Sequence, residues 1–160
     1  MPISVASRDN AFGVSAALRG ALAGVFRETL ALEGCRARDV SIVLSCDPEL
    51  RELNRRWRKI DRATDVLSFP YAYERMRIDG DLIISLDRLA AQAKRYRVTP
   101  GKELMRLVVH GALHLCGHDH HRVAERQVMR SAEAAARRAS AARVVALDRG
   151  LKALRRVDKP

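Results

Sequence analysis

The stretch HGALHLCGHDHH, residues 110–121, contains all five histidines of this 160-residue chain. His110 and His114 are four residues apart, so on a helix their side chains project from one face. Gly117 follows three residues later and can adopt the left-handed conformation that ends a helix and turns the chain. Such a turn brings His120 back toward the first two histidines. The stretch therefore predicts a helix that ends at a three-histidine metal site.

The spacing of these residues matches the metzincin zinc signature. Three neutral nitrogen ligands leave a fourth position for water, which is typical of a catalytic zinc and not of a structural one. A lone histidine is usually an ordinary surface or core residue, but five gathered in one segment with ligand spacing favour a metal. We expect one zinc ion per chain, held by His110, His114 and His120. His118 and His121 are the alternatives for the third ligand.

Gly111 stands where zinc proteases of this spacing carry the glutamate that acts as general base. No carboxylate can project from a glycine, so a peptidase is disfavoured. The remaining chemistry is that of a metal-bound water, whose pKa zinc can lower to about 7. Positive charge from elsewhere in the chain must then stabilise the transition state. Such charge suits cleavage of a phosphodiester better than cleavage of an amide.

The chain as a whole is strongly basic, with 30 Lys and Arg against 19 Asp and Glu and a formal net charge of +11. This charge attracts polyanions and favours contact with nucleic acid, although an arginine-rich solvated surface is the alternative interpretation. The three cysteines are odd in number and widely spaced, which suits reduced thiols in the cytoplasm. The sequence has neither the N-terminal pattern of a signal peptide nor an apolar run long enough to span a membrane.

Hydrophobic periodicity predicts about four strands interleaved with about five helices, in one α/β or α+β domain. The expected strands cover residues 3–7, 40–45, 65–71 and 80–86. The expected helices cover residues 15–34, 47–57, 86–98, 99–117 and 123–147. The last residues are basic and predicted to be frayed.

Three motifs of this chain resemble those of one known family. HGALHLCGHDH (110–120) is similar to the HGxLHLxGxDH signature of the YbeY family of zinc-dependent endoribonucleases. LNRRWRKIDRATDVLSFP (53–70) resembles that family's LNxxxRxxxxxTDVLSFP stretch, and GDLIIS (80–85) resembles its GDIxIS strand. The likeness runs from about residue 40 to about residue 135. His118 and His121 depart from the pattern, because the family often has tyrosine and an acidic residue at these positions.

The resemblance implies a small single α+β domain with a four-stranded sheet, surrounding helices and a zincin-like metal-site helix. This domain would comprise residues 1–140, and residues 141–160 would form a basic C-terminal tail, either RNA-binding or poorly ordered. The implied zinc ligands are His110, His114 and His120. The implied activity is cleavage of single-stranded RNA, in maturation of the 16S rRNA 3′ end and in ribosome quality control. The small ribosomal subunit is the implied partner, with no DNA or membrane expected.

By the resemblance the family's functional arginine falls on Arg58, so Arg58 and His114 are the expected catalytic residues. A guanidinium group grips a phosphate at two points, stays charged and can stabilise the transition state. The alternative for Arg58 is an ordinary arginine at a helix end. Asp65 and Asp119 either orient a ligand histidine or only fix turns of the chain. Besides the disfavoured peptidase, the rival functions are a non-catalytic ribosome-assembly factor with a structural zinc and a metal-dependent hydrolase of a small phosphoester.

Overall fold

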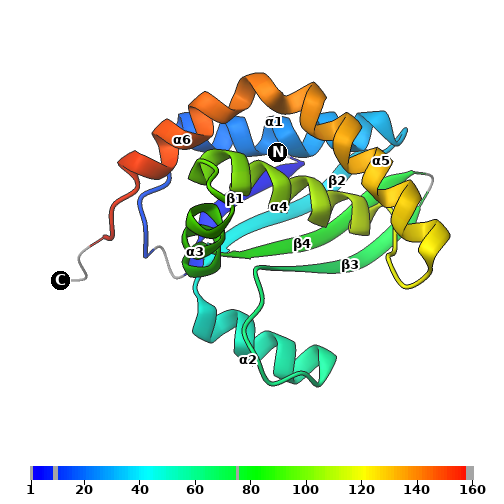
Figure 1. Cartoon of the computed structure of the whole chain (residues 1–160), viewed down its shortest axis with the longest axis horizontal. Helices are drawn as coiled ribbons and strands as arrows, with labels where there is room; N and C mark the ends of the chain where they lie inside the picture. The colour runs from blue at the N-terminus through cyan, green and yellow to red at the C-terminus, as the bar shows by residue number, and fades with distance from the viewer. Residues whose placement is uncertain (1, 9–10, 75, 158–160) are drawn as a thin grey trace.

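A four-stranded sheet forms the centre of the molecule (Figure 1). The computed structural model describes residues 2–8, 11–74 and 76–157, without the side chains of Ala72 and Tyr73. The strands are β1 (Ile3–Ser7), β2 (Arg36–Ser45), β3 (Val66–Glu74) and β4 (Arg77–Ser85), in the order β1-β2-β4-β3. β1, β2 and β4 run parallel, while β3 pairs antiparallel with β4.

Helices cover both faces of this sheet (Figure 1). They are α1 (Ala16–Leu32), α2 (Asp47–Arg58), α3 (Leu86–Tyr96), α4 (Pro100–Leu115), α5 (Val123–Ser140) and α6 (Val144–Ala153). On one face α4 packs through Leu104 and Val108 into the main core with Leu82 of β4. On the other face Leu50 of α2 packs against Leu67 and Ile83. The expected α+β domain is confirmed, and no described helix is long and apolar enough to cross a bilayer.

The helix that carries the first two histidines begins and ends where its sequence predicts. The Thr99 hydroxyl accepts a hydrogen bond from the backbone N–H of Lys102 at 3.2 Å, and Pro100 occupies the first turn. At the other end Gly117 has φ +96°, and the His118 N–H donates to the Leu113 carbonyl at 3.0 Å. The turn predicted at Gly117 is therefore present, and it sends the chain back across the end of α4.

The C-terminal segment differs from its expectation. The helix predicted over residues 123–147 is divided, because the 3-10 turn Ala141–Arg143 (η2) separates α5 from α6. The fraying expected from Asp148 onward is wrong for residues 148–153, which belong to α6, a helix that packs against α1 and α4. Residues 158–160 lie outside the described residues. Leu147 is fully buried, and the Asp148 carboxylate accepts a hydrogen bond from the Gly101 N–H at 2.6 Å. Apolar residues at helical spacing hold this basic segment on the core.

Candidate metal centre

Three histidines converge at the C-terminal end of α4. One ring nitrogen from each of His110, His114 and His120 lies within 4.8 Å of the other two. The Nε2 atoms of His110 and His114 are 3.1 Å apart. Two ligands at 2.0–2.1 Å from a tetrahedral zinc are about 3.3 Å apart, so this pair has the separation that a shared zinc requires. The structure thus brings together the residues expected to bind the metal.

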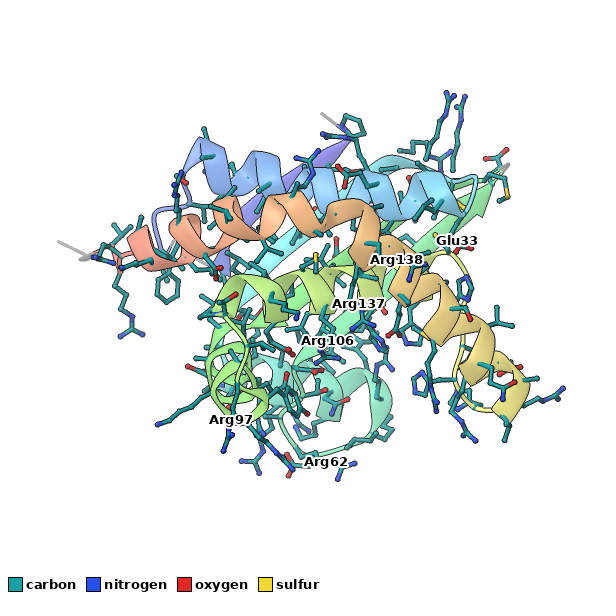
Figure 2. The ribbon with its side chains drawn as sticks, turned by 45° about the horizontal axis from the view of Figure 1, so that its top comes forward. Glu33, Arg62, Arg97, Arg106, Arg137 and Arg138 are labelled. Carbon is teal, nitrogen blue, oxygen red and sulfur yellow. The ribbon has the colours of Figure 1, made fainter. Side chains whose placement is uncertain are left out.

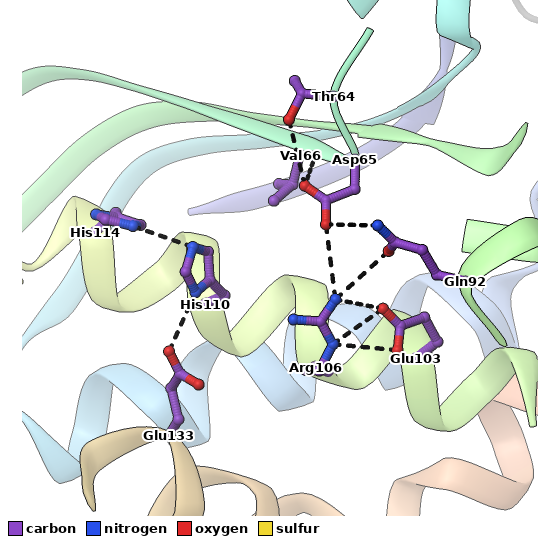
Figure 3. Close-up of polar contacts among 9 residues, drawn as sticks. All are labelled: Thr64, Asp65, Val66, Gln92, Glu103, Arg106, His110, His114 and Glu133. Carbon is purple, nitrogen blue, oxygen red and sulfur yellow. Dashed lines mark hydrogen bonds and ion pairs between the residues drawn. The ribbon is translucent and has the colours of Figure 1, made fainter. Parts of the chain in front are cut away.

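Hydrogen bonds fix which ring nitrogen of the two helical histidines carries the proton; Figure 3 shows the one between His110 and Glu133. His114 Nδ1 lies 2.9 Å from the His118 carbonyl oxygen, and because a carbonyl can only accept, Nδ1–H donates. His110 Nδ1 lies 3.1 Å from a carboxylate oxygen of Glu133 on α5 and donates to it. Both Nε2 atoms therefore keep free lone pairs that face each other, as two ligands of one cation do.

The electrostatics of the cluster keep its central ring neutral. Burial, together with the neighbouring His110, lowers the pKa of His114 to about 4. The hydrogen bond from His110 lowers the pKa of the Glu133 carboxyl, so this group is ionised near neutral pH. Neutral imidazole is the form that binds a metal, and an ionised carboxylate behind His110 makes that ring a better ligand.

Gly111, which lies between His110 and His114 in the sequence, has a packing role. A Cβ built on Gly111 would lie 2.0 Å from Cδ1 of Leu82, which is itself fully buried in β4. α4 therefore approaches the sheet so closely that a larger side chain has no space at residue 111. This contact explains in physical terms why a glutamate base is absent here.

The other two histidines are not part of the three-nitrogen cluster. His118 Nε2 lies 2.9 Å from a carboxylate oxygen of Glu33, just beyond the end of α1. The His121 side chain is 79% exposed, and its Nε2 lies 3.2 Å from Asp119. Asp119 also accepts a hydrogen bond from the backbone N–H of His120 at 2.7 Å, which fixes the turn. His120 is thus the third histidine of the cluster, as expected.

Asp65 holds the start of β3 and touches no ring of the cluster among the described contacts. Its carboxylate accepts hydrogen bonds from the Val66 N–H at 2.8 Å and from Gln92 at 3.2 Å (Figure 3). Arg106 of α4 lies 3.6 Å from the same carboxylate. These contacts support the structural interpretation of Asp65 and not its role as a partner of a ligand histidine.

A cleft of about 650 Å³ opens in front of the histidines, and Arg58 also lines it. Arg58 is the last residue of α2, and its Nη2 donates to the Ser68 carbonyl of β3 at 3.2 Å. The rest of the exposed guanidinium has no hydrogen bond or ion pair to any described residue. The cleft thus holds a cluster of unprotonated nitrogens together with a cation able to bind an anion.

Two polar residues of the site escaped the sequence analysis. Glu133 lies on the same face of α5 as the buried residues Met129 and Ala136. Asn54 is 5% exposed, and its side-chain amide donates to the Arg62 carbonyl at 2.9 Å, which ties down the loop before β3. Both residues could have been found from the sequence as polar residues on the apolar face of an amphipathic helix. A buried polar group without a partner is costly there, so such a residue is expected to have a partner.

Replacing Glu133 with alanine is expected to weaken zinc binding by about 10-fold to 100-fold, because His110 loses the acceptor that orients its ring. Glu133→Gln keeps an acceptor without the charge and should retain more of the affinity. Competition with a chromogenic chelator measures both constants. Equal zinc affinity in the wild type and Glu133→Ala would show that this contact does not support the metal.

Known proteins of one family are similar to this chain in sequence. The family described as Endoribonuclease YbeY matches residues 4–140. The protein named Endoribonuclease YbeY from Carboxydothermus hydrogenoformans is 46% identical over 106 residues, which cover 66% of this chain and 73% of the relative. The one from Desulfitobacterium hafniense is 40% identical over 133 residues, which cover 73% and 84%. For the relative from Anaeromyxobacter sp. (strain Fw109-5), 45% identical over 112 residues, the match spans 69% of this chain but only 58% of the relative.

One solved structure also resembles this fold. The solution structure of TM1509 from Thermotoga maritima superposes with a TM-score of 0.60 at 28% sequence identity. The match covers 86% of this chain and 88% of that protein. Together with the family match, these relatives show that the chain belongs to the endoribonuclease YbeY family.

Proposed function

We propose that this protein is a zinc-dependent endoribonuclease that cuts single-stranded RNA in the cytoplasm. Its expected roles are maturation of the 16S rRNA 3′ end and ribosome quality control, with the small ribosomal subunit as partner. The observation that carries the proposal is the convergence of three imidazoles on a cleft that also holds the Arg58 guanidinium. The name of its relatives supports the nuclease class, and the net charge of +11 supports a polyanionic substrate.

Each residue of the cleft has a defined task in this proposal. His110, His114 and His120 would hold the zinc, with Glu133 and the His118 carbonyl orienting two of the rings through their Nδ1–H groups, so that Nε2 faces the ion. A bound zinc supplies Lewis acidity toward a phosphoryl oxygen and lowers the pKa of water. Arg58 would donate hydrogen bonds to the non-bridging phosphate oxygens and stabilise their charge as it grows in the transition state.

The shape of the cleft supports an unpaired substrate. A single strand can present its backbone to a recessed metal centre, whereas a rigid duplex cannot bend into it. Contacts to phosphates carry no sequence information directly, so we expect weak sequence preference.

The exposure of the cluster supports a catalytic site over the rival structural zinc. Structural zinc sites are closed by four protein ligands. In the described part of the chain the cluster contains three His, Cys, Asp or Glu residues, and the third of them, His120, is exposed. A position directed to the cleft remains for substrate or water.

Incubation of the protein with a labelled single-stranded rRNA fragment tests this function. We expect zinc-replete protein to produce internal cuts, a chelator to stop them, added zinc to restore them, and a duplex of the same sequence to resist. His114→Ala protein purified in the same way controls for contaminating nucleases. Absence of cutting by the zinc-replete protein, or cutting that persists unchanged in chelator, would refute the proposal.

A further inference from the structure

A second pocket lies where α3, α4 and α5 meet, outside the cleft of the histidines. It has a volume of about 400 Å³, within the range of ligand-binding pockets. Arg106 and Arg137, which come from α4 and α5, lie close together in it (Figure 2). Its lining residues are Tyr96, Val98, Lys102, Glu103, Arg106 and Arg137.

The charges in this pocket leave an excess of two cations. Glu103 is 2% exposed and pairs with Arg106, whose Nε donates to it at 3.0 Å, so these two charges cancel. Lys102 is exposed and forms no ion pair with a described carboxylate, while Arg137 lowers the pKa of the Glu133 carboxyl without a described contact within 4.0 Å. Two cations that line one pocket without a carboxylate in direct contact are a site for an anion such as a phosphate.

An aromatic ring completes the pocket. Tyr96, the last residue of α3, is 52% exposed, and the Arg95 guanidinium lies 6.0 Å from its ring centroid. Exposed aromatic rings next to cationic side chains are the combination that binds single-stranded nucleic acid, because bases stack on the ring while the cations hold the backbone.

The pocket is connected to the histidine cleft through α4. Arg106 in the pocket reaches Asp65, which lines the cleft, at 3.6 Å (Figure 3). Lys102 precedes His110 by eight residues, which is about 12 Å along a helix axis. Single-strand binding sites extend over roughly 4–16 nucleotides, so one strand can reach both places.

We propose that this pocket is a second RNA subsite. Lys102 and Arg137 bind a backbone phosphate, and Tyr96 stacks a base, of the same strand whose scissile phosphate lies at the histidine cluster. The inference rests on the proposed nuclease function and adds to it the path of the substrate across α4. It predicts that affinity depends on RNA length, since a very short RNA in the cleft does not reach the pocket.

The double variant Lys102→Ala/Arg137→Ala tests the subsite through equilibrium binding. The probes are single-stranded RNAs of 16 and 2 nucleotides with phosphorothioate linkages, which keep the charge and slow cleavage, and binding to zinc-loaded protein is followed by fluorescence anisotropy. We expect about tenfold weaker binding of the longer RNA and unchanged binding of the shorter one. The plot of log K against log salt should become shallower by about 0.7, since the two cations bind one phosphate and each lost phosphate contact removes about 0.7. Tyr96→Ala should weaken binding about fivefold or more without changing that slope.

The matched control is Arg19→Ala/Arg27→Ala, which removes two exposed charges from α1 that form no described ion pair. Equal losses in both double variants, or no loss in Lys102→Ala/Arg137→Ala, would overturn the subsite. Thermal melting checks that the variants fold. Cleavage of the natural RNA is measured in parallel: if the wild type cuts nothing, the nuclease proposal fails, while the binding comparison still decides the subsite.

Discussion

Replacing His114 with alanine is expected to lower the rate of RNA cleavage by about a thousandfold or more and to remove zinc from the purified protein. The His114 ring is held by the His118 carbonyl at 2.9 Å and presents Nε2 at 3.1 Å from that of His110. Its loss leaves two histidines, too few to retain the ion. Lewis-acid stabilisation by a metal contributes several kcal/mol, and each 1.4 kcal/mol changes a rate about tenfold. Initial rates on labelled RNA, with metal analysis of the same samples, measure the effect.

Two further variants make this result specific. His121→Ala removes a neighbouring imidazole that is 79% exposed and does not belong to the three-histidine cluster, so it should keep its zinc and most of its activity. If His114→Ala proves unstable because the His118 carbonyl loses its partner, His120→Ala supplies the same test from an exposed loop. Cleavage by a zinc-free, folded His114→Ala protein at the wild-type rate would contradict the account.

Replacing Arg58 with alanine is expected to lower cleavage by about 100-fold to 1000-fold while zinc content stays at the wild-type value. The guanidinium lines the cleft and makes one hydrogen bond, to the Ser68 carbonyl, so most of its donors are available for a phosphate. Removing one donor that stabilises a developing negative charge has an effect of this size in other enzymes. Because the side chain is exposed, the melting temperature should change little. Single-turnover rates, metal analysis and thermal melting together give the three readouts.

Arg56→Ala is the matched control for Arg58, since Arg56 is exposed on the same helix but does not line the cleft. It should cleave RNA at nearly the wild-type rate. Arg58→Lys keeps the charge but loses the fork of donors, so we expect only partial activity. Equal activity of Arg58→Ala and Arg56→Ala would assign Arg58 to the ordinary role of an arginine at a helix end.

Much of the fold could be predicted because its signals are local. Thr99 and Pro100 determine where α4 begins, and Gly117 determines where the chain turns back, without help from distant residues. The same local pattern brings His120 to His110 and His114, so the three-histidine cluster could be predicted from a single segment.

Contacts between distant segments could not be predicted in this way. Glu133 reaches His110 only because α5 packs across α4, and the packing of α5 has no local signature. The basic end from Asp148 onward looked frayed, but Gly150 is buried in α6, which packs on α1 and α4, helices far away in the sequence. The pocket at Tyr96 likewise joins residues from three helices, so its cations are invisible as a group in the sequence.

The most direct test of the metal centre is anomalous diffraction at the zinc absorption edge from crystals of the zinc-loaded protein. The account predicts one anomalous peak per chain, within bonding distance of Nε2 of His110, Nε2 of His114 and a ring nitrogen of His120. A peak beside His118 and Glu33, or no peak at the three histidines, would contradict it.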